Sequence, residues 1–155
     1  EQGQLEYDCP EGWIFTDMGN ILFFMPEESG QQTGANVIAY IIPMEGFGEY
    51  ADLKEVENAL KEQLPAMIPN LLMLDPERES SEPKLTSRRL VGAKTKDALE
   101  VTLTYSVLGL PMKSTVFILF FEDMCVEVCY TALTEDFSGQ YRDAKALAKS
   151  VSPAQ

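Results

Sequence analysis

Apolar residues recur at three- and four-residue intervals in two parts of the chain, which is typical of a helix that buries one face. The first part follows Asp52, which can form a capping box with Glu55. The second part follows Thr134, the predicted N-cap, with Glu135 and Asp136 in the first turn. The predicted apolar stripes are Leu53, Val56, Leu60 and Leu64 before Pro65 in the first helix, and Phe137, Tyr141, Ala144, Leu147, Ala148 and Val151 in the second.

Alternating or continuous apolar runs predict strands along the rest of the chain. In Glu100–Val107 apolar and polar residues alternate, so we expect one face of this strand, including Glu100, to lie in solvent. Thr115–Phe121 is apolar on both faces and should lie in the middle of a sheet, and Met124–Thr131 follows it after a tight turn. The other predicted strands are Leu5–Cys9, Asn20–Met25, Val37–Ile42, Leu71–Leu74 and Leu85–Val91.

Hairpin-linked strands with separate helices predict the α+β class, with an antiparallel β-sheet flanked by helices. The 155 residues match the usual size of one domain, so we predict a single domain over residues 1–155. In this interpretation residues 1–4 are a polar lead and residues 152–155 are a tail.

Composition excludes several classes of function. The sequence has no histidine, which removes Ser-His-Asp and Cys-His catalysis and histidine-ligated zinc. The net charge of −13 disfavours nucleic acid as a partner, and no apolar run approaches the roughly 18 residues of a membrane span. The one basic cluster is too small and too poor in aromatic residues for a nucleic-acid surface; it consists of Lys84, Arg88, Arg89, Lys94 and Lys96.

The charge is also uneven, because residues 1–53 contain no Lys or Arg, and residues 1–82 hold 17 acidic and 3 basic residues. Two interpretations stay open. The acidic part is either a solvated surface that keeps the protein soluble or a face that attracts a basic partner. A calcium loop is disfavoured because the sequence contains no matching acidic motif.

Cys125, Glu127 and Cys129 alternate onto one face of a predicted strand and could form a thiol–carboxylate site. The alternative is that both cysteines are core residues, which we favour because no histidine is present to activate a thiol. The two cysteines are about 13 Å apart in a strand and cannot form a disulfide with each other, so only Cys9 could bridge to one of them. We predict that Cys125 and Cys129 are reduced, buried and structural.

Other candidate residues have ordinary structural interpretations. Trp13 is expected to be a core anchor, and Gly46–Gly48 is too short and too acidic in its surroundings for a phosphate loop. Asp8, Glu11 and Asp17 are close in sequence but lack the two contrasting environments of an acid–base pair. Core packing is favoured over an adaptable binding groove for the methionines in or beside predicted core elements, namely Met25, Met44, Met67, Met73 and Met124.

Cys9-Pro10-Glu11-Gly12-Trp13 resembles the P-x-G-W motif of PsbP-like and DcrB-like domains, in which the Trp packs under the sheet. The order of elements is similar as well, with a final helix after the segment from Tyr130 to Phe137. The resemblance extends from Leu5 to Val151, with a departure at residues 150–152, where Ser-Val-Ser replaces the family's frequent Ser-Phe. It implies an α/β/α sandwich around an antiparallel sheet.

The resemblance also implies a class of function. The family includes the PsbP subunit of photosystem II, a Ran-binding transport factor, exported bacterial lipoproteins and type VI secretion chaperones. We therefore expect a non-enzymatic binding or accessory protein that acts on a protein or cell-envelope component, with no cofactor, metal or catalytic residue. The alternative is an intracellular type VI secretion-type chaperone that cradles an apolar helix of an effector. An enzyme built on Cys125 or Cys129 is a third, less favoured class.

The polar N-terminus and the exported relatives suggest export to the periplasm, the cell surface or the medium, with a possible lipid anchor on a removed N-terminal segment. A cytoplasmic location is expected instead if no signal segment precedes residue 1.

Overall fold

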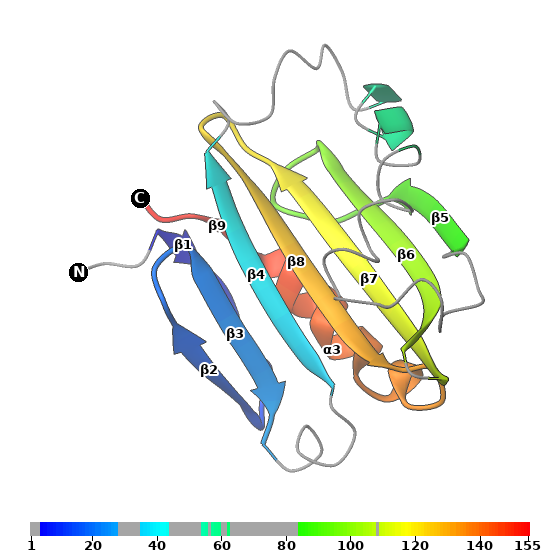
Figure 1. Cartoon of the computed structure of the whole chain (residues 1–155). Coiled ribbons are helices and arrows are strands. Elements are labelled where there is room, and N and C mark those ends of the chain that lie inside the picture. Colours follow the sequence, from blue (N-terminus) through cyan, green and yellow to red (C-terminus); the bar gives the residue numbers. More distant parts are fainter. Residues whose placement is uncertain are drawn as a thin grey trace.

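Among the residues that the computed structural model of the chain describes, a seven-stranded antiparallel sheet and one long helix dominate the fold (Figure 1). The structure describes residues 4–27, 35–43, 54–55, 57–59, 62, 84–107 and 109–155. The strand order is β2-β3-β4-β8-β7-β6-β5. The bounds are β2 Trp13–Asp17, β3 Ile21–Pro26, β4 Asn36–Pro43, β5 Lys84–Arg89, β6 Ala98–Val107, β7 Leu110–Phe120 and β8 Met124–Leu133.

The predicted α+β class with an antiparallel sheet is confirmed. The strand predicted at Thr115–Phe121 corresponds to the second half of β7, which lies between β6 and β8, as its two apolar faces require. The strand predicted at Leu71–Leu74 lies outside the described residues. The connection from β6 to β7 is short, because Val107 already pairs with Leu110 and Gly109, with a φ of 81°, completes a tight turn.

The two ends of the described chain pair with each other. Strand β1 covers Leu5–Glu6 rather than the predicted Leu5–Cys9, and it pairs antiparallel with β9, Ser152–Pro153. The prediction that residues 152–155 are a tail is therefore wrong. The side chain of Ser150 also accepts a hydrogen bond from the backbone N–H of Asp8 over 2.9 Å. The backbone groups of β1 and β9 obtain hydrogen-bond partners only because these two segments lie side by side.

Helix α3 spans Phe137–Ser150 and lies behind β8 and β7 in the view of Figure 1. Its N-cap is Asp136, without a side-chain cap, so the predicted cap at Thr134 is wrong. The acidic residues expected in the first turn precede the helix instead, because Asp136 donates its N–H to the carbonyl of Leu133 in a turn that ends β8. The predicted apolar stripe is largely confirmed: Tyr141 is half-buried, and the buried residues are Phe137, Ala144, Leu147, Ala148 and, at the C-cap, Val151.

Helix α3 packs on one face of the sheet, which we call the helix face. Val126, Val128 and Tyr130 of β8 lie on this face, and all three are fully buried. The register of β7 against β8 adds Phe117 and Leu119, both without exposed surface. Burial of this many large apolar side chains in one layer is the main source of stability for the fold.

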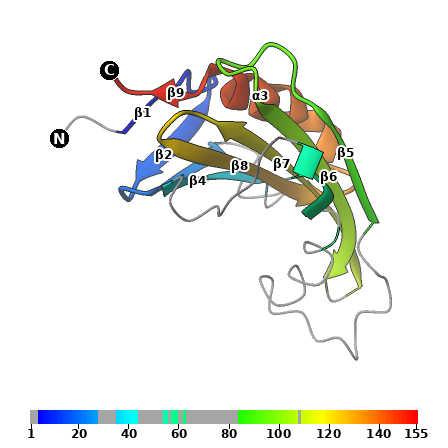
Figure 2. The same ribbon diagram turned by 90° about the horizontal axis from the view of Figure 1, so that it is seen from above.

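The opposite face carries Cys125, Glu127 and Cys129 of β8, and we call it the cysteine face. The register across β8, β7, β6 and β5 places Ser87 on this face, and its hydroxyl bonds the carboxylate of Glu57. Helical backbone is described at residues 54–55, 57–59 and 62, and Figure 2 shows these turns near β6. Helices on both sides of the sheet agree in part with the expected sandwich.

The prediction that Glu100 faces solvent is wrong. Glu100 is 2% exposed, because it lies on the helix face, where α3 covers it. The apolar residues that alternate with it, Leu99 and Val101, are buried on the cysteine face. Strand β6 is therefore covered on both sides, and its one buried carboxylate requires partners.

Candidate functional site

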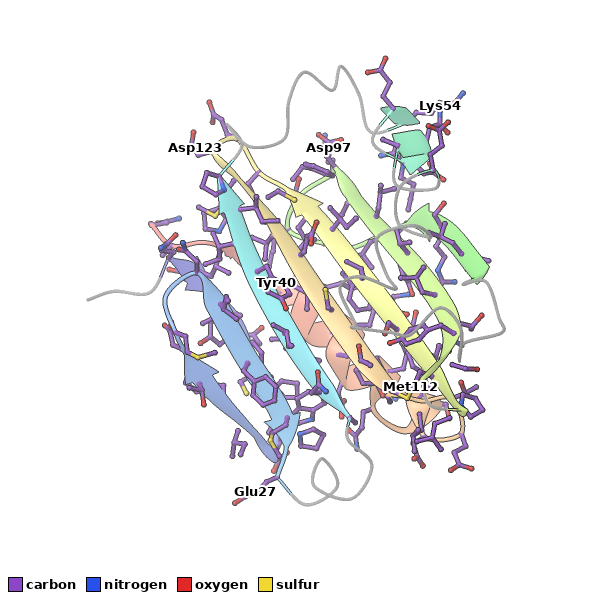
Figure 3. The ribbon with its side chains drawn as sticks, viewed as in Figure 1. Glu27, Tyr40, Lys54, Asp97, Met112 and Asp123 are labelled. Atoms are coloured by element: carbon purple, nitrogen blue, oxygen red, sulfur yellow. The ribbon has the colours of Figure 1, made fainter. Side chains whose placement is uncertain are left out.

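The thiol–carboxylate stripe lies in the middle of the sheet. All three cysteines are free, and Cys125 is buried as predicted. Cys129 is half-buried, so the prediction that it is buried is only partly correct. Tyr40 of β4 lies directly opposite Glu127 of β8, and Figure 3 shows Tyr40 over the centre of the sheet.

The electrostatics of this stripe disfavour nucleophilic chemistry. Burial, and then the neighbouring carboxylate of Glu127, raises the pKa of the Cys129 thiol to about 12 and raises the pKa of Cys125 as well. Burial also raises the pKa of Glu127 itself. A thiol with a raised pKa carries almost no thiolate near neutral pH, and thiolate is the reactive form. The stripe therefore lacks a reactive thiolate, and its Cys125 belongs to the structural core.

A second polar cluster joins β5, β6 and α3 around Glu100. The guanidinium of Arg88 donates two hydrogen bonds to the carboxylate, of 2.9 and 3.0 Å, and Lys145 donates another over 3.1 Å. Tyr141 completes the cluster through a hydrogen bond from its hydroxyl to the same carboxylate. Both carboxylate oxygens thus have cationic or hydroxyl partners, which a buried charge needs.

The same partners set the proton affinity of the cluster. Burial by itself would raise the pKa of Glu100, but the bonds from Arg88, Tyr141 and Lys145 outweigh it and hold that pKa below its usual value. A carboxylate that is already ionised and fully bonded is a poor general base. We conclude that the cluster ties α3 to the edge of the sheet.

A pocket of about 400 Å³ lies beside this cluster, between α3 and strands β5 to β7. Lys113 reaches into the same region, with its ammonium 4.5 Å from the ring centre of Phe137. Two hydroxyl groups on the pocket wall, those of Thr102 and Thr115, pair with each other over 3.1 Å. The lining residues are Thr86, Ser87, Arg88, Glu100, Thr102, Lys113, Thr115, Phe137, Ser138 and Tyr141.

A third feature is a group of exposed apolar side chains on the hairpin formed by β2 and β3. Ile14, Phe15, Met18 and Ile21 are exposed by 46%, 54%, 63% and 37%, and we call them the edge surface. Only Val91 and Leu110 are other large apolar residues with comparable exposure in the described part of the chain. Four of these six residues thus gather on a single hairpin, at the sheet's β2 edge.

The edge surface is held in place by aromatic packing on the helix face. The Phe15 ring lies 6.1 Å from that of Phe24 and 6.0 Å from that of Tyr7, in an edge-to-face contact with Tyr7. Trp13, the first residue of β2, is 9% exposed and belongs to the core, as predicted. One end of β2 is therefore anchored, while its side chains from Ile14 onward are presented to solvent.

The remaining predicted candidates have structural places or lie outside the described residues. Asp17 accepts a hydrogen bond from the N–H of Gly19 over 2.8 Å and shapes the turn before β3. Met25 and Met124 are half-buried. The described residues contain no group of Cys, Asp and Glu that could hold a metal ion, and no described helix is long and apolar enough to cross a bilayer. Met44, Met67, Met73 and Gly46–Gly48 lie outside the described residues.

Sequence reasoning missed β2 and the Glu100 cluster. A signal for β2 existed, because the aromatic and β-branched run from Trp13 is followed by Gly19 and Asn20 and then by the next apolar run, a hairpin pattern. A signal for the cluster was weaker. Tyr141 and Lys145 are four residues apart on α3, but nothing local pairs them with Glu100.

No protein-family model matches the sequence, and no curated protein matches it. Solved structures do match. A crystal structure from Bacteroides thetaiotaomicron superposes with a TM-score of 0.60 at 11% identity, over 98% of this chain but 46% of that one. The chain therefore spans less than half the length of that protein.

Two further structures match over most of both chains. The Saccharomyces cerevisiae Ran-binding protein Mog1p has a TM-score of 0.57 at 11% identity, over 97% of this chain and 90% of that one. Cyanobacterial PsbP from Synechocystis has a TM-score of 0.56 at 10% identity, over 99% of this chain and 95% of that one. These similarities show a PsbP-like and Mog1-like fold, as the motif at residues 9–13 implied.

Proposed function

We propose that the chain is a non-enzymatic module that binds another protein through the edge surface. The observation that carries this proposal is the concentration of exposed apolar side chains, Ile14, Phe15, Met18 and Ile21, on one hairpin. Single exposed apolar residues scattered over a protein surface are common, whereas several on one hairpin favour an interaction site. Ile14 lies on the cysteine face and Phe15 on the helix face, so apolar side chains flank the β2 edge on both sides of the sheet.

The chemistry of the described residues supports a binding role over a catalytic one. The thiols of Cys125 and Cys129 have raised pKa values, and the Glu100 carboxylate is ionised and fully bonded. Mog1p, which shares the fold, is described as Ran-binding, so protein binding is a function found on this scaffold.

The test is site-specific crosslinking in cells that naturally make the protein. In one version a photo-crosslinking residue replaces Thr16, which is exposed on β2 beside Phe15 of the edge surface. In a second version it replaces Leu110, which is 55% exposed at the start of β7, away from the edge surface. We expect one defined adduct from position 16, its loss when Ile14→Lys is added, and its retention with Val91→Lys. Equal adducts from both positions, or an adduct insensitive to Ile14→Lys, would refute the proposal.

Export to the cell envelope stays a prediction, which cell fractionation of the full-length protein tests. The intracellular chaperone alternative also stays a prediction. It requires an apolar helix to bind the cysteine face, so a crosslinker at Tyr40, rather than at Thr16, would then give the adduct.

A further inference from the structure

We propose that β2 is a docking strand, which pairs backbone to backbone with an extended segment of the partner. That segment carries apolar residues opposite Ile14 and Phe15 and a lysine or arginine opposite Asp17. The inference rests on the proposed protein-binding function and specifies the chemistry of the partner.

The hydrogen-bond ladder shows which backbone groups are available. The N–H of Glu27 donates to the carbonyl of Gly12, and the N–H of Met18 donates to the carbonyl of Ile21, both over 2.9 Å. Because directly opposed residues in antiparallel pairs alternate between bonded and non-bonded, residues 12, 14, 16 and 18 point their backbone groups toward β3. Residues 13, 15 and 17 point theirs away from the sheet.

Of the residues that point outward, Trp13 has a backbone partner, whereas Phe15 and Asp17 have none in the described part of the chain. The N–H of Trp13 donates to the carbonyl of Pro10 over 3.2 Å. The N–H and C=O groups of Phe15 and Asp17 have no partner among the described residues. Edge strands that avoid pairing usually carry lysine, proline or a bulge, and β2 has none of these. It is thus a template for one more strand.

The side chains of β2 define what the added strand must carry. Phe15 and Asp17 lie on the helix face, since they pair with Phe24 and Leu22, whereas Ile14 lies on the cysteine face. A cross-strand neighbour of Ile14 or Phe15 gains contact by being apolar, and a neighbour of Asp17 gains by being cationic.

Charge selects a basic partner over a second copy of this chain. Residues 4–27 carry five acidic residues and no Lys or Arg. A pocket of about 320 Å³ beside the hairpin turn includes Glu6, Tyr7 and Asp17 in its lining and offers space for a cationic side chain. A second copy would place its own acidic residues on this surface, which like-charge repulsion opposes.

The experiment uses the full chain labelled with ¹⁵N and a peptide whose core is lysine, threonine, valine and isoleucine in that order, flanked by lysines. Two control peptides replace the core lysine by glutamate or methylate the backbone nitrogen of the valine. We expect the parent peptide to slow amide hydrogen exchange at Phe15 and Asp17 at least tenfold at saturation, while Val91 is unchanged. We expect both control peptides, and the Ile14→Lys chain, to bind at least tenfold more weakly, and the Val91→Lys chain to bind normally.

Each other outcome overturns the inference in a recognisable way. If the N-methylated peptide binds as tightly as the parent, the contact uses side chains alone and strand pairing is wrong. If the glutamate peptide binds equally well, the charge selection is wrong. If Phe15 and Asp17 are already protected without peptide and the chain sediments as a dimer, a second copy is the occupant. If no peptide binds while the crosslink at Thr16 still forms, docking by strand pairing fails but the protein-binding function stands.

Discussion

Replacement of Glu100 by glutamine removes one buried charge and leaves the size of the side chain unchanged. The carboxylate accepts bonds from Arg88, Lys145 and Tyr141, and hydrogen bonds to charged groups each contribute about 1.5–3 kcal/mol. The loss is smaller than their sum, because the Arg88 and Lys145 side chains are 63% and 26% exposed and regain water. We expect Glu100→Gln to lower the free energy of unfolding by about 2–3 kcal/mol, below the roughly 3–5 kcal/mol of a stranded buried charge.

The assay is urea denaturation together with thermal unfolding at several pH values. For a domain of this size we expect the melting temperature to fall by about 5–10 °C at pH 7. Since the folded pKa of Glu100 is lowered, its contribution is fully present above the ordinary value of about 4.3 and disappears as the pH falls through the folded pKa. The difference between the two proteins should therefore shrink in acid.

The matched control is Glu122→Gln, because Glu122 is an exposed carboxylate in the turn between β7 and β8. It should change the free energy of unfolding by less than about 0.5 kcal/mol. If Glu100→Gln is as mild as this control at pH 7, or if its effect is the same at every pH, the carboxylate is not the tie between α3 and the sheet that we infer.

Two further predictions concern buried groups of β8. Cys125→Ala should cost about 1 kcal/mol through lost packing, and the native Cys125 thiol should react with an aromatic disulfide reagent far more slowly than in urea; fast reaction in the native state would contradict its burial. Burial raises the pKa of Tyr130 to about 12, so the stability that Tyr130 contributes should be complete below pH 10 and lost as the pH rises toward 12. Tyr130→Phe loses the 2.8 Å hydrogen bond to the carbonyl of Phe137, and it should remove this alkaline dependence at a cost of about 1 kcal/mol in the free energy of unfolding. Ultraviolet titration of the phenols measures the pKa of Tyr130, and denaturation of Cys125→Ala and Tyr130→Phe at several pH values measures the changes in the free energy of unfolding.

Much of the fold could be predicted because it depends on local periodicity. The stripe of α3 repeats every three or four residues, and the alternation in β8 separates Val126 and Val128 from the two thiols with a period of two. Both patterns are set by backbone geometry and need no knowledge of the neighbours. The uneven distribution of charge is equally visible in the sequence. It is compatible with either a solvated surface or a face for a basic partner, and we propose the second for the β2 edge.

The antiparallel α+β class, the apolar layers and the lack of histidine chemistry all follow from the amino-acid sequence. The burial of Glu100, the pairing of residues 152–153 with β1 and the exposure of β2 as an edge follow instead from how the chain packs. Each of these three features depends on partners far away in the chain. The partners of Glu100 lie 12 to 45 residues away, and an edge is defined by the strand that is missing beside it. Local pattern shows which face of an element is polar, whereas packing decides whether water or a charged side chain meets it.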